Sequence, residues 1–184
     1  MKKISTIFLL FISYLCIGQQ YITNSAKISF FSEAPLEDIS AINQNVGAIY
    51  DSSTKEFAFQ LNIEDFKFKK ELMREHFNEN YLESHKFPTS TFIGKIIKSD
   101  SDQNLYPIDV VVEGVIKIHG IEKNIIVKGV IDKNFDNNQI ETLSVESNFS
   151  ILLKDFKVKI PKIVIHNIAE EIEITVNARM SKIQ

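Results

Sequence analysis

Hydrophobic and polar residues alternate with a period of two over long stretches of this chain. This alternation is typical of β-strands that bury one face, because successive side chains of a strand point to opposite sides. The clearest apolar rows are Phe57, Phe59, Leu61 and Ile63; Ile108, Val110, Val112, Gly114, Ile116 and Ile118; Leu143, Val145, Ser147, Phe149, Ile151 and Leu153; and Ile172, Ile174, Val176 and Ala178. Since each row is one-sided, we expect the strands to be antiparallel.

Short polar segments separate the strand patterns and predict turns. They lie at residues 51–54, 99–104, 119–120 and 136–138. Strands joined in this way, without helices between them, exclude a doubly wound α/β plan. Gly94, Gly114 and Gly129 fall inside strand patterns, where glycine permits a bend or a close approach of backbones. A mainly β fold with a curled antiparallel sheet closing into a barrel is therefore expected, with a flat sandwich as the alternative.

The segment 69–84 is the one stretch patterned as a helix. Its apolar stripe at helical spacing comprises Leu72, Met73, Phe77 and Tyr81, and its polar face comprises Glu71, Arg74, Glu75, Asn78 and Glu79. Just before it, Phe66 and Phe68 have the opposite parity to Phe57 and Phe59, which predicts a break in the strand near residues 64–65. We expect one short α-helix that closes or flanks an end of the barrel, with this aromatic pair at the rim beside it.

The N-terminus is patterned as an export signal. Lys2 and Lys3 precede the apolar run 7–12, and a small residue follows at Gly18. Residues 1–18 are expected to be a signal peptide, and residues 19–184 a single mature domain. Lipidation of Cys16 is the alternative, although Leu15 stands where a lipidation motif prefers a small side chain. Export across the inner membrane predicts a periplasmic location.

Charge and composition exclude several classes of function. Removing residues 1–18 takes away two lysines and no acidic residue, so the formal net charge changes from −3 to −5. An acidic domain is poorly suited to nucleic acid, whose phosphates need a basic face. The chain's only cysteine is lost with the signal, so the mature domain has no disulfide and no thiolate metal site.

The histidines lack the spacing of a metal site. His76, His85, His119 and His166 are scattered, and no nucleophile elbow, paired-carboxylate signature or phosphate-binding glycine loop is present. We expect no enzyme activity, no cofactor and no metal. We expect His119, which precedes Gly120, to lie in a tight turn with its ring bonded to backbone. We expect His76 to lie at the border of the helix's buried stripe.

Two motifs resemble those of a known family. The first is the run Lys86-Phe87-Pro88-Thr89-Ser90-Thr91-Phe92, which follows a helix pattern containing His76-Phe77-Asn78. The second is the segment 112–123, with His119-Gly120 after an apolar strand. In this order, after an export signal, they resemble the YceI-like family over roughly residues 25–180. The resemblance implies an exported bacterial protein with a lipocalin-like antiparallel barrel that holds a polyisoprenoid or another amphiphilic lipid in its lumen.

An apolar lumen needs only aliphatic and phenyl groups to hold a lipid chain, because burial of apolar surface is itself favourable. The candidate lumen residues are Phe57, Phe59, Leu61, Phe66, Phe68, Phe77, Phe92, Ile116, Ile118, Phe149 and Ile151. The expected partners are an isoprenoid or fatty-acyl lipid and, transiently, a membrane. The alternative is that these side chains fill the interior of a ligand-free envelope interaction or structural module. The sequence does not fix the oligomeric state.

Overall fold

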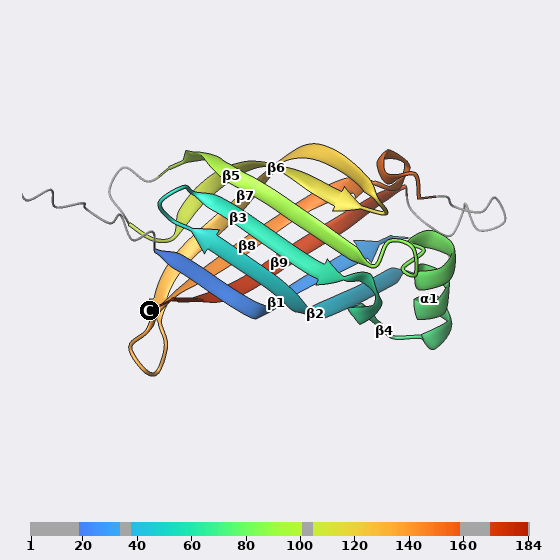
Figure 1. Cartoon of the computed structure of the whole chain (residues 1–184), viewed down its shortest axis with the longest axis horizontal. Coiled ribbons are helices and arrows are strands. Elements are labelled where there is room, and N and C mark those ends of the chain that lie inside the picture. Colours follow the sequence, from blue (N-terminus) through green and yellow to red (C-terminus); the bar gives the residue numbers. More distant parts are fainter. Residues whose placement is uncertain (1–18, 34–37, 101–104, 159–169, 184) are drawn as a thin grey trace, which may run out of the picture.

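The computed structural model describes residues 19–33, 38–100, 105–158 and 170–183. Their strands form one closed, antiparallel, eight-stranded barrel (Figure 1). The order around the barrel is β1-β9-β8-β7-β6-β5-β3-β2, and β2 pairs back with β1. The predicted closing sheet is thus confirmed, and the flat sandwich is excluded.

The eight barrel strands correspond to the alternating stretches of the sequence. They are β1 (Gln20–Ser32), β2 (Ile39–Asp51), β3 (Glu56–Asn62), β5 (Thr89–Ser99), β6 (Ile108–Ile118), β7 (Ile121–Phe135), β8 (Glu141–Leu152) and β9 (Glu171–Lys182). In β3 the side chains of Phe57, Phe59 and Leu61 are buried, and every residue between them is exposed. The period-two pattern therefore identifies the inward face of the barrel.

The predicted break between β3 and the next aromatic pair is confirmed. A 3₁₀ turn, η1 (Ile63–Asp65), ends the strand, and the backbone N–H of Phe66 donates a hydrogen bond to the carbonyl oxygen of Ile63 at 3.3 Å. The two-residue strand β4 (Lys67–Phe68) then pairs with β2. The turn lets Phe66 and Phe68 reach the rim although their parity differs from that of β3.

The helical segment lies across one end of the barrel (Figure 1). It consists of α1 (Glu71–His76) and a π-helical turn, η2 (Phe77–Tyr81). The helical segment is thus shorter than the predicted range 69–84. At Glu83 the backbone φ is 44°, which no right-handed helix has, so the helix cannot extend to residue 84. The helical segment is followed by β5, and a short 3₁₀ helix, η3 (Leu153–Phe156), follows β8.

The predicted division of the helix into buried and wet faces is partly wrong. Leu72, assigned to the buried stripe, is 60% exposed, whereas Asn78, assigned to the wet face, is only 9% exposed. Asn78 Nδ2 donates to the carbonyl oxygen of Arg74 at 2.9 Å, so its amide folds back onto the helix. The wider π-helical turn changes the angular spacing after His76, so an α-helical period misplaces Asn78. Leu72 lies before this turn, in α1, which has no buried residue.

The three strand glycines allow a close approach, as expected, and a Cβ atom on Gly129 would come within 2.7 Å of the carbonyl oxygen of Glu146. Gly94 and Gly114 lie opposite each other on β5 and β6. A Cβ atom on Gly114 would come within 2.5 Å of the carbonyl oxygen of Ile93, and one on Gly94 within 2.6 Å of the Phe92 ring. The pair therefore makes room for the Phe92 ring inside the barrel.

No helix formed by the described residues has the length and apolar character needed to cross a membrane. The predicted signal peptide, with Cys16, and His166 lie outside the described residues.

Candidate functional site

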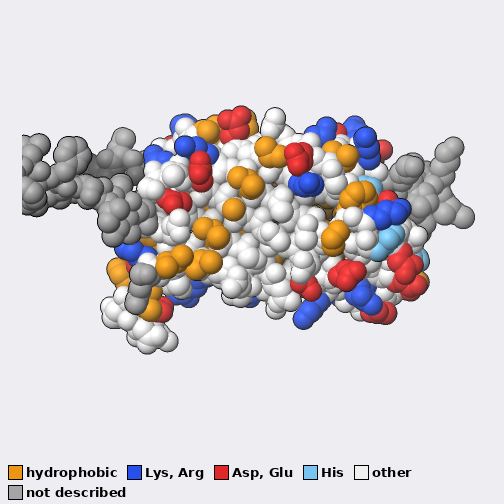
Figure 2. Space-filling view, in the orientation of Figure 1, with side chains coloured by type: hydrophobic (Ala, Val, Ile, Leu, Met, Phe, Trp, Pro, Cys, Tyr) orange, Lys and Arg blue, Asp and Glu red, His pale blue; other side chains and the backbone are white. Residues whose placement is uncertain are grey.

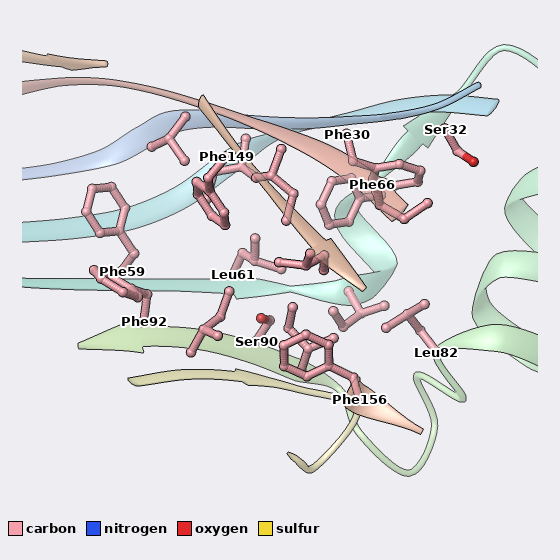
Figure 3. A pocket seen from close by; sticks show the side chains of 18 of the residues that line it. Phe30, Ser32, Phe59, Leu61, Phe66, Leu82, Ser90, Phe92, Phe149 and Phe156 are labelled. Atoms are coloured by element: carbon pink, nitrogen blue, oxygen red, sulfur yellow. The ribbon is translucent and has the colours of Figure 1, made fainter. Parts of the chain in front are cut away.

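A cavity of about 600 Å³ occupies the barrel interior. Side chains from the barrel strands, η1, β4 and the helical segment line it. In the close view, Phe59 and Phe92 lie together deep in the cavity, and Phe30 and Phe66 lie together towards the helical end (Figure 3). Its volume is within the usual range of sites for small molecules, which is roughly 300–1,000 Å³.

All eleven predicted lumen residues lie on the cavity wall. Eight of them come from barrel strands: Phe57, Phe59 and Leu61 from β3, Phe92 from β5, Ile116 and Ile118 from β6, and Phe149 and Ile151 from β8. The other three come from the segment beside the rim: Phe66 and Phe68 from the η1–β4 segment, and Phe77 from η2. The barrel thus brings together residues that are up to 94 positions apart, from 57 to 151. Their contact with a ligand stays a prediction.

The set of predicted lumen residues missed part of the wall. Phe30 on β1 and Phe156 in η3 also line the cavity. So do several inward residues of rows that the sequence had identified only as strand faces, namely Val110, Val112, Val145, Ile172, Ile174 and Val176. Their strand parity was sufficient to find them, whereas Phe156 lies in a short turn whose position no periodic pattern fixes.

An aromatic cluster holds the helical segment against the barrel rim. The Phe77 ring of η2 stacks on Phe30, with ring centroids 5.4 Å apart, and lies 5.6 Å from Phe66 and 5.0 Å from Phe68. Such aromatic pairs are worth about 0.5–1.5 kcal/mol each beyond the area that they bury. Phe77 therefore joins the helical segment to β1 and to the η1–β4 segment at the edge of the cavity.

The cavity opens at the end covered by α1. Three exposed residues in or next to α1 also line the cavity and mark this opening, and they are Lys70, Leu72 and His76. Gln60 on β3 and Lys128 on β7 are also exposed and line the cavity. His76 is thus at the opening and exposed, not at the border of a buried stripe. Figure 2 shows histidine side chains beside hydrophobic ones at this end of the molecule.

The inner wall offers little polar chemistry. The hydroxyl of Ser90 donates to the carbonyl oxygen of Lys117 at 2.7 Å, and that of Ser147 donates to the carbonyl oxygen of Lys128 at 2.7 Å. Each hydroxyl proton is therefore used by the barrel's own backbone. A molecule in the cavity would be held mainly by apolar contacts along its length.

The opposite end of the barrel is packed solid. Tyr21, Leu143 and Met180 are at most 2% exposed there. The Tyr21 hydroxyl hydrogen-bonds to the Glu141 carboxylate, and this contact lowers the pKa of Glu141. Burial raises the pKa of Tyr50, in the same region, to about 12. The cavity is consequently closed at this end and has one opening.

His119 joins three segments at the end where α1 lies. Its Nδ1 atom lies 3.0 Å from the carbonyl oxygen of Phe156, and its Nε2 atom lies 3.1 Å from Oε2 of Glu83. The predicted turn is confirmed, since His119 has a φ of 50° and Gly120 a φ of 71°. The ring is bonded to backbone as expected, and the contact with Glu83 adds a link that the sequence did not indicate.

Within the described residues, no group of three or more His, Cys, Asp or Glu side chains is placed to hold a metal ion. A second, shallow cleft lies outside the barrel between η1 and the helical segment, lined by Glu64, Glu71, Arg74, Glu75, Asn78 and Glu79. Arg74 forms an ion pair with Glu71 in it. The apolar cavity of the barrel is therefore the best candidate for a functional site.

A closed antiparallel barrel with a one-ended apolar cavity defines the class of small barrels that enclose a ligand-sized space. The model of the YceI-like domain family matches residues 23–180. The chain therefore belongs to the YceI-like domain family, as its two motifs indicated. A search of curated proteins found no match.

Solved structures share the fold at low sequence identity. A polyisoprenoid-binding domain from Saccharophagus degradans, implicated in plant cell wall breakdown, has 8% identity and a TM-score of 0.70, and the match covers 90% of this chain and 99% of that one. BcnA of Burkholderia cenocepacia has 13% identity and a TM-score of 0.67, over 84% of this chain and 95% of that one. The YceI protein of Campylobacter jejuni has 17% identity and a TM-score of 0.60, and the match covers 100% of both chains.

Proposed function

We propose that the protein binds the apolar chain of a lipid, an isoprenoid or a fatty-acyl amphiphile, inside the barrel. The observation that carries this proposal is the mostly apolar cavity of about 600 Å³, in which the hydroxyls of Ser90 and Ser147 are already bonded to backbone. A solidly packed interior would have favoured the ligand-free envelope module. The description of the Saccharophagus degradans domain as polyisoprenoid-binding supports an isoprenoid as ligand.

The polar head group of the lipid lies at the α1 end in this proposal. The cavity has its opening there, and Lys70 and His76 stand beside it. A head group deeper in the barrel would lose its hydration without gaining hydrogen-bond partners, which is costly. The chain end therefore points towards the closed end, near Phe57.

The role that we propose is carriage or storage of the lipid in the periplasm, with no chemical conversion. The export pattern of residues 1–18 supports the location. A carrier exchanges its cargo with a membrane, so the opening at α1 would contact a lipid surface transiently. The wall of the cavity is mostly apolar, which supports binding without catalysis.

Thermal unfolding of delipidated protein tests the binding. A polyprenyl alcohol at one hundred times its Kd should stabilise the folded state by about 2.7 kcal/mol. For a domain of this size, that raises the melting temperature by roughly 5–10 °C. No shift with either prenyl or fatty-acyl lipids would contradict the proposal.

A pair of matched variants locates the binding site. Phe149→Trp puts a larger ring on the cavity wall and should reduce the lipid-induced shift. Phe135→Trp makes the same replacement at a side chain that is 60% exposed, and should leave the shift unchanged. An equal shift in both variants would place the lipid outside the barrel.

A further inference from the structure

The cavity ends abruptly within the barrel. Its deepest wall residues include Phe57 on β3, Gly129 on β7 and Val145 on β8. The next inward residues along β7 and β8 are Ile131 and Leu143, which are 1% and 2% exposed and belong to the packed core. A chain that enters from the α1 end therefore meets a floor at the level of these wall residues.

Phe57 is the largest side chain of this floor, and an aromatic stack supports it from behind. Its ring stacks on Tyr50 with centroids 4.3 Å apart and an interplanar angle of 23°. Tyr50 in turn lies 6.2 Å from the ring of Tyr21, which is 1% exposed. Because closely packed rings leave no free volume behind Phe57, its ring cannot retreat from an incoming chain.

The partner of Phe57 on β5 contributes no side chain to the floor. Phe57 pairs with Gly94 on β5. A Cβ atom at Gly94 would come within 2.6 Å of the Phe92 ring and 2.9 Å of Val112 Cγ1, so the floor leaves no room for a side chain at this point. The Phe57 ring thus forms this side of the floor by itself.

We infer that Phe57 determines how long an apolar chain the barrel can hold. This inference rests on the proposed lipid binding and adds a selection by chain length to it. Each methylene group that enters the cavity should raise the affinity about fourfold. Once the terminal methyl group reaches Phe57, further methylene groups stay in water at the opening and add nothing.

A series of saturated fatty acids that differ by two carbons tests the inference in the full mature protein. Their affinities are measured by displacement of a fluorescent apolar dye from delipidated protein. For the wild type we expect affinity to rise with chain length up to a break and then to level off. Phe57→Ala should move the break to longer chains, by about two to four methylene groups, because the removed ring leaves space of that order.

Two further variants complete the test. Phe57→Leu keeps an apolar side chain at the floor, preserves the fold if Phe57→Ala does not, and should move the break by a smaller amount in the same direction. Phe149→Ala removes the same ring from the side wall, so it should weaken all chain lengths without moving the break.

The possible results are distinct. A break that stays in place in both Phe57 variants, or a wild-type affinity that rises without levelling off, overturns the inference and leaves the lipid binding intact. Absence of binding at every chain length, for the fatty acids and for polyprenyl alcohols alike, overturns the proposed function, and the inference with it. A break that moves only in the Phe57 variants supports both.

Discussion

The ring of Phe87 lies edge-on to the imidazole of His119, with the two ring centroids 4.6 Å apart. The two residues belong to the two sequence motifs that resemble those of the YceI-like family. Gly120 lies directly beneath this contact, since a Cβ atom there would come within 2.6 Å of Phe87 Cε1. Phe87 and His119 are 32 positions apart in the chain, and their contact makes the two motifs one packed unit at the end where α1 lies.

Gly120→Ala should destabilise this unit. Gly120 has a φ of 71°, which alanine adopts only with strain, and the added methyl group would meet the Phe87 ring. We expect the free energy of unfolding to fall by about 1–3 kcal/mol, measured by urea denaturation. Gly47→Ala is the control, because the nearest atom to its Cβ would be 3.8 Å away. A loss as large at Gly47 would contradict this explanation.

The stability of the barrel should depend on pH through Glu83. A hydrogen bond from Lys86, and then one from His119, lowers the pKa of Glu83 below its ordinary 4.5. The folded state therefore favours the carboxylate, and its contribution to stability is present above the ordinary pKa and is lost as the pH falls through the lowered one. In Glu83→Gln, the free energy of unfolding should fall less between about pH 7 and pH 3 than in the wild type, as measured by urea denaturation at each pH. An unchanged acid slope in the variant would contradict the assignment.

Tyr21→Phe tests the closed end of the barrel. The variant loses the hydrogen bond to Glu141, the main cause of that residue's lowered pKa. The Glu141 pKa, followed by NMR titration, should rise towards its ordinary value, and the free energy of unfolding should fall by about 1–2 kcal/mol. Tyr81→Phe is a suitable control, because the Tyr81 hydroxyl has no hydrogen-bond partner among the described residues. Equal effects of the two variants would argue against a specific role for Tyr21.

Phe77→Ala should loosen the helical segment at the opening of the cavity. The variant loses ring contacts with Phe30, Phe66 and Phe68. We expect faster amide hydrogen exchange over residues 71–81 and a cost of about 2–4 kcal/mol in global stability. Leu72→Ala, on the same segment but 60% exposed, should change neither quantity appreciably. Exchange that is no faster in Phe77→Ala would show that other contacts hold the segment.

The sequence predicted the barrel well because the strand signal is local. One-sided alternation in β3 places Phe57 and Phe59 inside without knowledge of any partner strand. The same logic failed for Phe30, because β1 has register shifts between Thr23 and Ala26 and between Ala26 and Ile28 that interrupt its alternation. A bulge changes which residues face inward, and the local sequence pattern of β1 does not predict where the bulges lie.

The helical segment was harder to predict because its geometry depends on tertiary contacts. The spacing of Leu72, Phe77 and Tyr81 indicated a helix, but not its change to a π-helical turn at Phe77. That residue is held by rings from β1 and from the η1–β4 segment. Likewise, Phe156 lies in the short helix η3 and reaches the cavity from there. Its carbonyl oxygen is hydrogen-bonded to His119, which is 37 positions away in the chain. Contacts of this kind become visible only once the barrel has closed.

Native mass spectrometry of residues 19–184, the predicted mature protein, tests the central claim most directly. After incubation with a polyprenyl lipid and removal of the excess, the account predicts one lipid per barrel. The bound fraction should fall in Phe149→Trp and stay the same in Phe135→Trp. An empty barrel in the wild type, or equal loading of both variants, would contradict the claim that the lipid occupies this cavity.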